Sequence, residues 1–289
     1  MTKFQPVIKW SGSKRSQCED ILGYFPQSID TYYEPFCGGC SMLMGLINSE
    51  ISVKRYVCSD INGDLIALWN KVKDSPDEIY NSYVALWNEL NKDNNIDRKR
   101  KFFEEQRSIY NENHDPLVFF FIMRTTTNGM PRYNQNGEFN NSFHITRDGI
   151  RPEMLKPILY EWSEKLRKSN VEFIHRSYEE IIDEIKEGDF IYMDPPYFNT
   201  KGMYFGEIDF ESFFVFLENV SKMNVKFALS FNGKSGDIDN TYSVPEKCYR
   251  RHLYIKSGNS SFKRTIGKDK NAIVYESLYL NYDDENCLW

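Results

Sequence analysis

The residues that end one apolar stretch of the chain have the types needed to hold a flat, amine-bearing group. Phe190 to Met193 read as a buried parallel strand, and Asp194-Pro195-Pro196-Tyr197 follow directly. Proline donates no N–H to a strand, so the strand must end here in a stiff loop. Ligands of open parallel sheets bind outside the carboxyl ends of the strands. The segment therefore offers an acceptor and a ring at a ligand site, although ordinary strand exits also use Asp and Pro.

A glycine turn and a distant carboxylate form a second candidate group. Glu34-Pro35-Phe36-Cys37-Gly38-Gly39 closes one expected strand, and Asp60 ends the next. Glycine lets the backbone approach a ligand closely, and a following helix offers unpaired N–H groups. In nucleoside-binding sheets a carboxylate about 20 residues beyond such a turn accepts from ribose hydroxyls. Because the G-x-G-x-x-G pattern is missing, we expect an adenosine-containing cofactor other than a dinucleotide. Alternatively, the glycines only make a tight turn and Asp60 caps a helix.

The loop Lys9-Trp10-Ser11-Gly12-Ser13-Lys14 precedes both groups. Trp10 offers a ring for stacking, and Lys14 offers a cation that can neutralise a carboxylate. Taken alone, this loop is better explained by a half-buried tryptophan and a surface lysine.

Length and composition are those of a globular protein. The 289 residues suit one large domain or two modest ones, with 40% hydrophobic and 27% charged residues. The longest apolar run, Leu117 to Met123, is too short to span a bilayer. The first residues contain no apolar core of the kind that a secretory signal needs, so we expect a cytoplasmic location without membrane association.

Six cysteines show no spacing of a disulfide framework, and we expect them to be reduced. Cys37 and Cys40 form a C-x-x-C pair, but a zinc site needs a second pair, so no metal is expected. A redox dithiol remains an alternative for this pair.

The net charge of −6 argues against general binding of polyanions. A basic segment near the C-terminus nevertheless contains Arg250, Arg251, Lys256, Lys263, Arg264, Lys268 and Lys270. Such a segment is either a nucleic-acid footprint or a solvated loop.

The order of expected elements favours an α/β fold with a doubly wound, Rossmann-like sheet. We expect strands at 31–36, 54–60, 171–175, 190–193 and 225–231. Helices are expected after the glycine turn, at 178–187 and at 209–223. An edge hairpin is expected to pair 252–256 with 272–280. These elements must bring the glycine turn, Asp60 and Asp194 to one edge of the sheet.

Residues 62–165 break the strand–helix alternation. Their helical patterns carry Trp69, Trp87 and Trp162, and Asn136-Gly137 predicts a β-hairpin turn. We therefore expect an inserted helical and hairpin domain at 62–165, between the two halves of a catalytic domain at 1–61 and 166–289.

Taken together and in this order, the motifs resemble those of the Dam-type (D12 class, alpha group) DNA adenine-N6 methyltransferases. They are the Lys9–Lys14 loop, the Glu34–Gly39 turn, Asp60 and the Asp194–Tyr197 segment. The resemblance continues through the hairpin "RYNQNGEFN" and the strand "ALSFN", so it covers most of the chain. It implies a methyltransferase fold that takes S-adenosyl-L-methionine as cofactor and methylates N6 of an adenine flipped out of double-stranded DNA, as a monomer or weak dimer.

The resemblance also implies roles for individual residues. Those expected to bind the cofactor are Trp10, Lys14, Glu34, Pro35, Phe36, Cys37, Gly38, Gly39, Asp60 and Asp194. Asp194, Pro195, Pro196 and Tyr197 are expected to hold the target adenine. Those expected to contact DNA, the last two from the basic segment, are Arg124, Asn128, Arg132, Tyr133, Asn134, Asn140, Lys263 and Arg264. The family pattern is lost at Ser142-Phe143-His144-Ile145, so a GATC target does not follow from the resemblance.

Three rival functions stay open at this point. A stiff Asp-Pro-Pro loop suits any planar amine or amide, so RNA or a protein glutamine is an alternative substrate. An inactive DNA-binding homologue is a second alternative, and a redox protein that uses Cys37 and Cys40 is a third.

Overall fold

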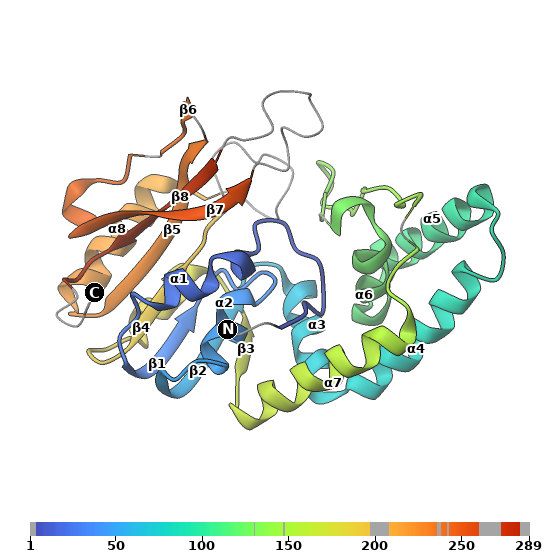
Figure 1. Ribbon diagram of the computed structural model, residues 1–289, viewed down its shortest axis with the longest axis horizontal. Helices are drawn as coiled ribbons and strands as arrows, with labels where there is room; N and C mark the ends of the chain where they lie inside the picture. Colours follow the sequence, from blue (N-terminus) through green and yellow to red (C-terminus); the bar gives the residue numbers. More distant parts are fainter. Residues whose placement is uncertain are drawn as a thin grey trace.

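A β-sheet organises the first and last parts of the chain (Figure 1). The computed structural model describes residues 4–129, 131–146, 148–196, 208–235, 238–241, 243–259 and 273–283. Within them the strand order is β3-β2-β1-β4-β5-β8-β7, and β6 pairs with β5. The strands are β1 (Ser28–Glu34), β2 (Ser52–Asp60), β3 (Glu172–His175), β4 (Phe190–Met193), β5 (Lys226–Ser235), β6 (Ile238–Asp239), β7 (Arg251–Asn259) and β8 (Ile273–Leu280).

The direction of the strands confirms the expected Rossmann-like class. Strands β3, β2, β1, β4 and β5 are parallel, while β8 and β7 add antiparallel pairs, as the hairpin prediction required. The strand order reverses between β1 and β4, which pair through Tyr32–Phe190 and Tyr33–Ile191. At such a reversal the connections leave toward opposite faces and open a crevice at the carboxyl ends of the strands. Glu34 and Asp194 stand at that edge.

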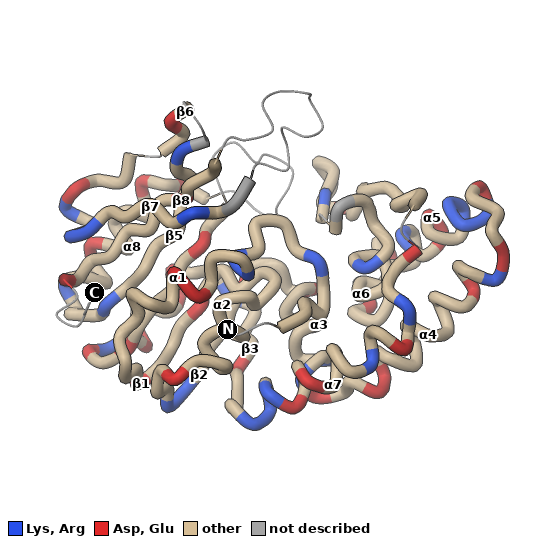
Figure 2. Tube along the Cα trace, in the orientation of Figure 1, with Lys and Arg blue, Asp and Glu red and all other residues tan. Residues whose placement is uncertain are grey.

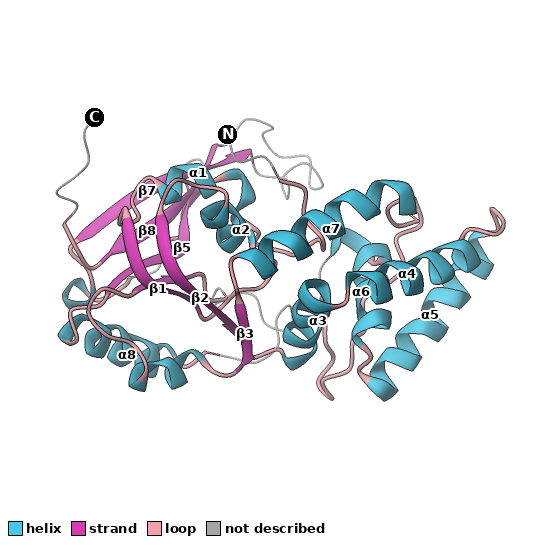
Figure 3. Cartoon of the chain, turned by 90° about the horizontal axis from the view of Figure 1, so that it is seen from below, coloured by secondary structure: helices cyan, strands magenta, loops and turns pink. Residues whose placement is uncertain are grey.

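Helices cover both faces of the sheet (Figure 3). In β4 the alternation of side chains sends Phe190 and Tyr192 into one hydrophobic core, and Ile191 and Met193 into a second. The first core includes residues of α1 (Cys18–Leu22) and α2 (Ser41–Ile47), and the second includes residues of α8 (Phe210–Lys222). Short 3-10 helices complete this part of the chain: η1 (Lys14–Ser16), η3 (Tyr178–Asp183) and η4 (Glu246–Cys248).

The helix expected at 178–187 is wrong in type and length. Only the 3-10 helix η3 forms, and it ends at Asp183. Beyond it, the Lys186 N–H donates to Asp189 Oδ2 at 3.0 Å, and the Thr31 N–H donates to Asp189 Oδ1 at 3.0 Å. The Asp189 carboxylate therefore holds the chain in a turn that leads into β4, and it ties this turn to β1.

Five longer helices connect β2 to β3 and lie beside the sheet (Figure 1). They are α3 (Gly63–Asp74), α4 (Pro76–Leu90), α5 (Ile96–Asn113), α6 (Pro116–Thr125) and α7 (Pro152–Lys168), with the 3-10 helix η2 (Thr127–Gly129) after α6. Trp69 of α3 stacks on Trp162 of α7 with ring centroids 5.2 Å apart. The domain limits at 61/62 and 165/166 stay a prediction. The second limit falls inside α7, which ends at Lys168.

The outer helices α4 and α5 and the turn between them carry charges of both signs (Figure 2). Lys92 pairs with Glu89 at 2.5 Å, and Arg98 pairs with Asp93 at 2.8 Å. Such mixed, paired charges are typical of a solvated surface and do not form a basic face. In the part of the chain that the structure describes, no helix is both long and apolar enough to cross a membrane.

The hairpin expected at Asn136-Gly137 forms around a single bridge, Tyr133–Phe139, and extended strands do not develop. Its turn closes by a 3.0 Å hydrogen bond from the Gly137 N–H to the Asn134 carbonyl, with Gly137 at φ +80°. Asn111 of α5 holds the hairpin in place, because its side chain bonds both the N–H and the carbonyl of Phe139.

The close packing of α2 on α1 generates a stability prediction. A Cβ at Gly45 would lie 2.0 Å from Cys18 Sγ, so Gly45→Ala must either turn the buried Cys18 side chain or displace α1. We expect a loss of about 1–3 kcal/mol in the free energy of unfolding, despite the higher helix propensity of alanine. Urea denaturation should show that adding Cys18→Ala recovers much of the loss. A single Gly45→Ala variant as stable as the parent would contradict this account.

Candidate active site

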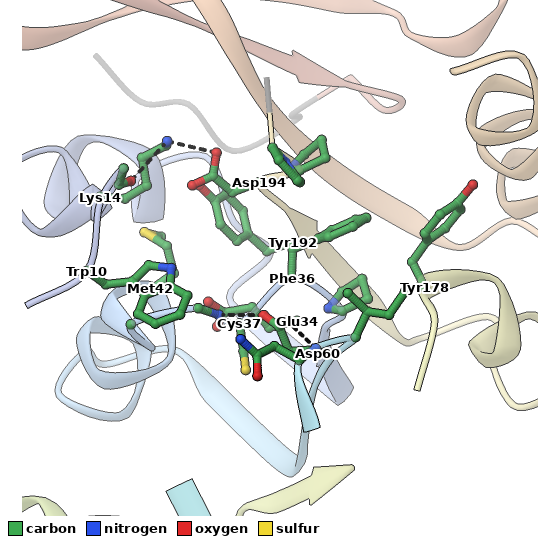
Figure 4. A pocket seen from close by; sticks show the side chains of 18 of the residues that line it. Trp10, Lys14, Glu34, Phe36, Cys37, Met42, Asp60, Tyr178, Tyr192 and Asp194 are labelled. Atoms are coloured by element: carbon green, nitrogen blue, oxygen red, sulfur yellow. Dashed lines mark hydrogen bonds and ion pairs between the residues drawn. The ribbon is translucent and has the colours of Figure 1, made fainter. Parts of the chain in front are cut away.

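One pocket opens where the strand order reverses (Figure 4). It encloses about 290 Å³, near the lower end of the ~300–1,000 Å³ usual for small-molecule sites. Every residue predicted to bind a cofactor lines it: Trp10, Lys14, Glu34, Pro35, Phe36, Cys37, Gly38, Gly39, Asp60 and Asp194. Pro195 and Pro196 line it as well. The fold thus gathers the loop before η1, the turn after β1, the end of β2 and the exit of β4 around one cavity.

The glycine turn is held through the two polar groups of a single residue. The Gly38 N–H donates to Asp60 Oδ2 at 3.1 Å, and its carbonyl accepts from Trp69 Nε1 at 2.8 Å. Gly38 has φ +44°, a left-handed conformation that glycine adopts with little strain. The motif pattern identified Gly38 and Asp60, but it gave no sign that Trp69 of the inserted helices holds the turn.

Trp10 lies directly against this turn. A Cβ at Gly38 would meet Trp10 Nε1 at 2.8 Å, and a Cβ at Gly39 would meet Trp10 Cβ at 2.8 Å. Both positions therefore require glycine for the indole to approach the backbone. The ring forms a wall of the pocket across from Asp60 (Figure 4).

The Asp60 carboxylate is half-buried and is hydrogen-bonded through both oxygens. Besides Gly38, it accepts from the Asn62 N–H at 3.0 Å on Oδ1. Burial raises the pKa of Asp60 to about 6, and these backbone hydrogen bonds oppose the rise. The group is therefore mainly ionised at neutral pH and can accept further hydrogen bonds.

Glu34 lies deeper, with only 3% of its surface exposed. Tyr32 Oη donates to Glu34 Oε2 at 2.8 Å. Burial raises the pKa of Glu34 to about 8, so the carboxyl is mainly protonated at neutral pH. Two carboxyl groups of the same pocket thus differ in charge because their surroundings differ.

Asp194, at the exit of β4, forms an ion pair with Lys14 (Figure 4). The Lys14 Nζ lies 2.7 Å from Asp194 Oδ1, and the lysine side chain is only 3% exposed. Beside Asp194, Tyr192 Oη and Ser230 Oγ are hydrogen-bonded at 2.8 Å. The proposed neutralising role of Lys14 thus has a partner in this structure, and that partner is the carboxylate of the Asp-Pro-Pro loop.

The start of η3, after β3, contributes residues that the motifs did not identify. Ser177, Tyr178 and Glu179 line the pocket, and the Tyr178 ring stacks on Phe36 with centroids 5.4 Å apart. In the sequence, these residues could have been found only from their position after the carboxyl end of an expected parallel strand.

Cys37 and Cys40 are buried, free thiols. Burial raises the pKa of Cys37 to about 11 and that of Cys40 well above its ordinary value. Both stay protonated at neutral pH, which argues against a reactive dithiol. Among the described residues, no group of three or more His, Cys, Asp or Glu side chains is placed to hold a metal ion.

The residues predicted to contact DNA differ in their surroundings. Arg132 and Asn140 are exposed on the hairpin. The Asn134 side chain is engaged in its own turn, where it accepts from the Asn136 and Glu138 N–H groups. Arg124 is only 7% exposed, and burial lowers its pKa, so a base contact would require its side chain to leave this position. Tyr197, Lys263, Arg264 and the side chain of Asn128 lie outside the described residues.

Tyr133 connects the hairpin to the pocket. Its hydroxyl accepts from Asn62 Nδ2 at 3.1 Å, and the Asn62 N–H in turn donates to Asp60. The hairpin that follows α6 is therefore fixed relative to the carboxylate at the end of β2.

Comparison with known proteins agrees with this arrangement. The model of the D12 class N6 adenine-specific DNA methyltransferase family matches residues 10–253. The DNA adenine methylase of Escherichia coli (strain K12) is 34% identical over 203 residues, which cover 68% of this chain and 66% of that protein. The Type II methyltransferase M.FokI of Planomicrobium okeanokoites is 24% identical over 290 residues, 95% of this chain and 43% of that protein. The Type II methyltransferase M1.LlaDCHI of Lactococcus lactis subsp. cremoris is 25% identical, with 67% of this chain and 66% of that protein covered.

The Asn62–Tyr133 contact predicts how firmly the hairpin is held. Tyr133→Phe removes the hydroxyl, a loss of about 1 kcal/mol that should speed amide exchange of Asn134 and Gly137 about fivefold. Hydrogen-exchange mass spectrometry measures this directly. Tyr80→Phe, at a half-buried position of α4, serves as the control and should leave the hairpin unchanged. Equal exchange in Tyr133→Phe and the parent protein would show that this contact does not restrain the hairpin.

Proposed function

The chain belongs to the D12 class N6 adenine-specific DNA methyltransferase family, and we propose that it transfers a methyl group from S-adenosyl-L-methionine to the N6 amine of adenine in double-stranded DNA. One observation carries the proposal: a single pocket joins the glycine turn and Asp60 to the Asp194-Pro195-Pro196 loop at the reversal of the strand order. A cofactor side and a target side thus meet within one cavity.

The residues on the cofactor side fit an adenosine-containing, cationic ligand. Asp60 is placed to accept from ribose hydroxyls, and the Phe36–Gly39 turn, free of bulky side chains at its glycines, is suited to line the methionine end. Of the described residues that line the pocket, Lys14 alone is basic, and its charge is directed at Asp194. An acidic pocket suits a sulfonium, and S-adenosylmethionine supplies an electrophilic methyl group on such a centre.

On the target side, Asp194 and the loop after it would activate the amine. The lone pair of the adenine exocyclic nitrogen is delocalised into the ring, which makes this nitrogen a poor nucleophile. Two acceptors for its hydrogens, the Asp194 carboxylate and the Pro195 main-chain carbonyl, would draw the nitrogen toward tetrahedral geometry and direct its lone pair at the methyl group. Orientation and electrostatics of this kind contribute several kcal/mol, on the order of a hundredfold or more in rate.

The reaction requires no strong base. Once methylated, the nitrogen is positively charged and acidic, so its proton can leave through Asp194 or to water. Fixing the amine is therefore the main task of the loop, and two prolines in succession keep that loop from adapting to other geometries.

The target nitrogen lies inside the duplex, so the adenine must leave the base stack to reach the pocket. We propose that Tyr197 offers its ring to the flipped base, a contact worth about 1–3 kcal/mol. Arg132 and Asn140, which are exposed on the hairpin, are our first candidates for contacts with the DNA near the target.

The direct test is methylation of genomic DNA by the purified chain with S-adenosylmethionine, mapped base by base with long reads. We expect N6-methyladenine at one recurrent short motif. Cofactor binding without any adenine modification would overturn the proposal in favour of RNA, a protein amide or a DNA-binding function.

The role of Asp194 predicts a strong kinetic defect. Asp194→Asn keeps the shape of the side chain but replaces the charged acceptor, and we expect kcat to fall by about 100-fold or more, a larger effect than on the affinity for the cofactor. Asp74→Asn, at an exposed position of α3, should behave as the parent protein. Turnover of Asp194→Asn close to the parent rate would exclude Asp194 as the acceptor for the target amine.

The pKa of Asp60, about 6, predicts a pH dependence of cofactor binding. Below pH 6 the carboxylate takes up a proton and loses acceptor strength, so affinity should weaken up to ~10-fold per pH unit. Calorimetric titration with S-adenosylhomocysteine between pH 5 and 8 measures this, and Asp60→Asn should bind weakly with little dependence on pH. Constant affinity of the parent protein from pH 7 to 5 would contradict the role of Asp60.

A fall in pH weakens cofactor binding through Asp60, but it increases the contribution of Asp60 to stability. Because the folded pKa lies above the ordinary value of 3.8, the folded state holds the proton more tightly than the unfolded state between these values. The contribution of Asp60 to stability therefore falls as pH rises through this window. Weaker binding at pH 5 consequently does not reflect unfolding caused by Asp60.

A further inference from the structure

The Lys14 ammonium has a second carboxylate partner, which lies outside the matched family range. Its Nζ is 2.7 Å from Asp194 Oδ1, 3.2 Å from Glu276 Oε2 and 3.3 Å from the Gly12 carbonyl. The Gly12 contact is a hydrogen bond, whereas Glu276 Oε2 contacts the ammonium as an ion pair without hydrogen-bond geometry and so acts on it through its charge. Glu276 belongs to β8, whereas the family model ends at residue 253.

Glu276 is held by the antiparallel part of the sheet. In β8 it pairs in register with Asn232 of β5 and Ile255 of β7. Its Oε1 accepts from Ser257 Oγ of β7 at 3.0 Å. The side chain is 20% exposed and Asp194 is 19% exposed, so water screens this group of charges only in part. A rigid strand thus presents a carboxylate to a lysine from the other end of the chain.

The charges of the three groups affect what Asp194 can do. Lys14 paired with Asp194 alone would neutralise the carboxylate and weaken it as an acceptor. With Glu276 present, the three groups together carry one net negative charge. The carboxyl of Glu34, which also lines the pocket, adds little negative charge, because burial raises its pKa to about 8 and keeps it mainly protonated.

On the premise of the proposed methyltransferase function, we propose that Glu276 is a positioning residue. By sharing the Lys14 ammonium with Asp194, it keeps the Asp194 carboxylate oriented and offsets the Lys14 charge, so that the carboxylate stays a strong acceptor for a hydrogen bond from the target amine. Glu276 itself does not touch the substrate; it acts through Lys14.

The test compares kcat and KM of the full chain on methylatable duplex DNA with S-adenosylmethionine. Glu276→Gln keeps the shape but removes the charge, and should lower kcat about 10-fold while changing KM for the cofactor less than about twofold. The acid limb of the kcat profile should move to lower pH, because loss of a negative charge makes Asp194 harder to protonate. In a Lys14→Met background, Glu276→Gln should have little further effect.

Glu172→Gln is the matched control. Glu172 of β3 also pairs with a basic residue, Arg55 of β2, at 2.7 Å, but both of these side chains are exposed. Its loss should leave kcat, KM and the pH profile unchanged. A merely structural role of Glu276 would lower the melting temperature and leave kcat per folded molecule as in the parent protein.

The outcomes separate this inference from the function on which it rests. An active parent protein with kcat undiminished in Glu276→Gln would overturn the role of Glu276 alone. If Glu276→Gln does not fold, Ser257→Ala provides the test. This variant keeps the charge of Glu276 but removes the hydrogen bond that holds its carboxylate, and we expect kcat to fall about threefold. An unchanged kcat in Ser257→Ala would overturn the inference. A parent protein that does not methylate DNA would overturn the proposed function and this inference with it.

Discussion

The peptide unit of Gly38 is the constraint on which the pocket depends. Asp60 accepts its N–H, and Trp69 donates to its carbonyl. Because Asp60 ends β2 and Trp69 belongs to α3, the turn after β1 is fixed from a neighbouring strand and from the first inserted helix. Trp10 can then pack on the glycines, since no side chain stands between them. A site held in this way needs little rearrangement when a ligand binds, which limits the free-energy cost of binding.

The carboxyl groups of the pocket differ in charge because their surroundings differ. The pKa of Glu34 rises to about 8 and that of Asp60 to about 6, while Asp194 shares the Lys14 ammonium. Since both raised values exceed those of an unfolded chain, both groups make stability fall as pH rises, through the windows 4.5 to 8 and 3.8 to 6. These two groups therefore contribute less to stability at neutral pH than at acid pH, while Asp60 stays mainly ionised where a cationic ligand would bind.

The inserted helices take part in the site as well as carrying the hairpin. Asn62 illustrates this: its N–H donates to Asp60, and its side chain donates to the Tyr133 hydroxyl. Asn111 of α5 holds the opposite side of the hairpin through Phe139. The hairpin that we propose to contact DNA is thus positioned from the sheet and from the helices together, so the target and cofactor sides keep a defined relation.

Local pattern alone determined the strands, the glycine turn, the Asp-Pro-Pro exit and their convergence on one edge, because residue spacing and proline or glycine chemistry act within a few residues. Only the tertiary structure decided which distant groups meet: Trp69 with the glycine turn, and Lys14 with both Asp194 and Glu276. It also buried Arg124, which had been expected to contact DNA, and ended the helix after Ser177 early. Such partners follow from strand order, crossovers and helix packing, and the free energy of these contacts is shared between segments far apart in the chain, so no local pattern records them.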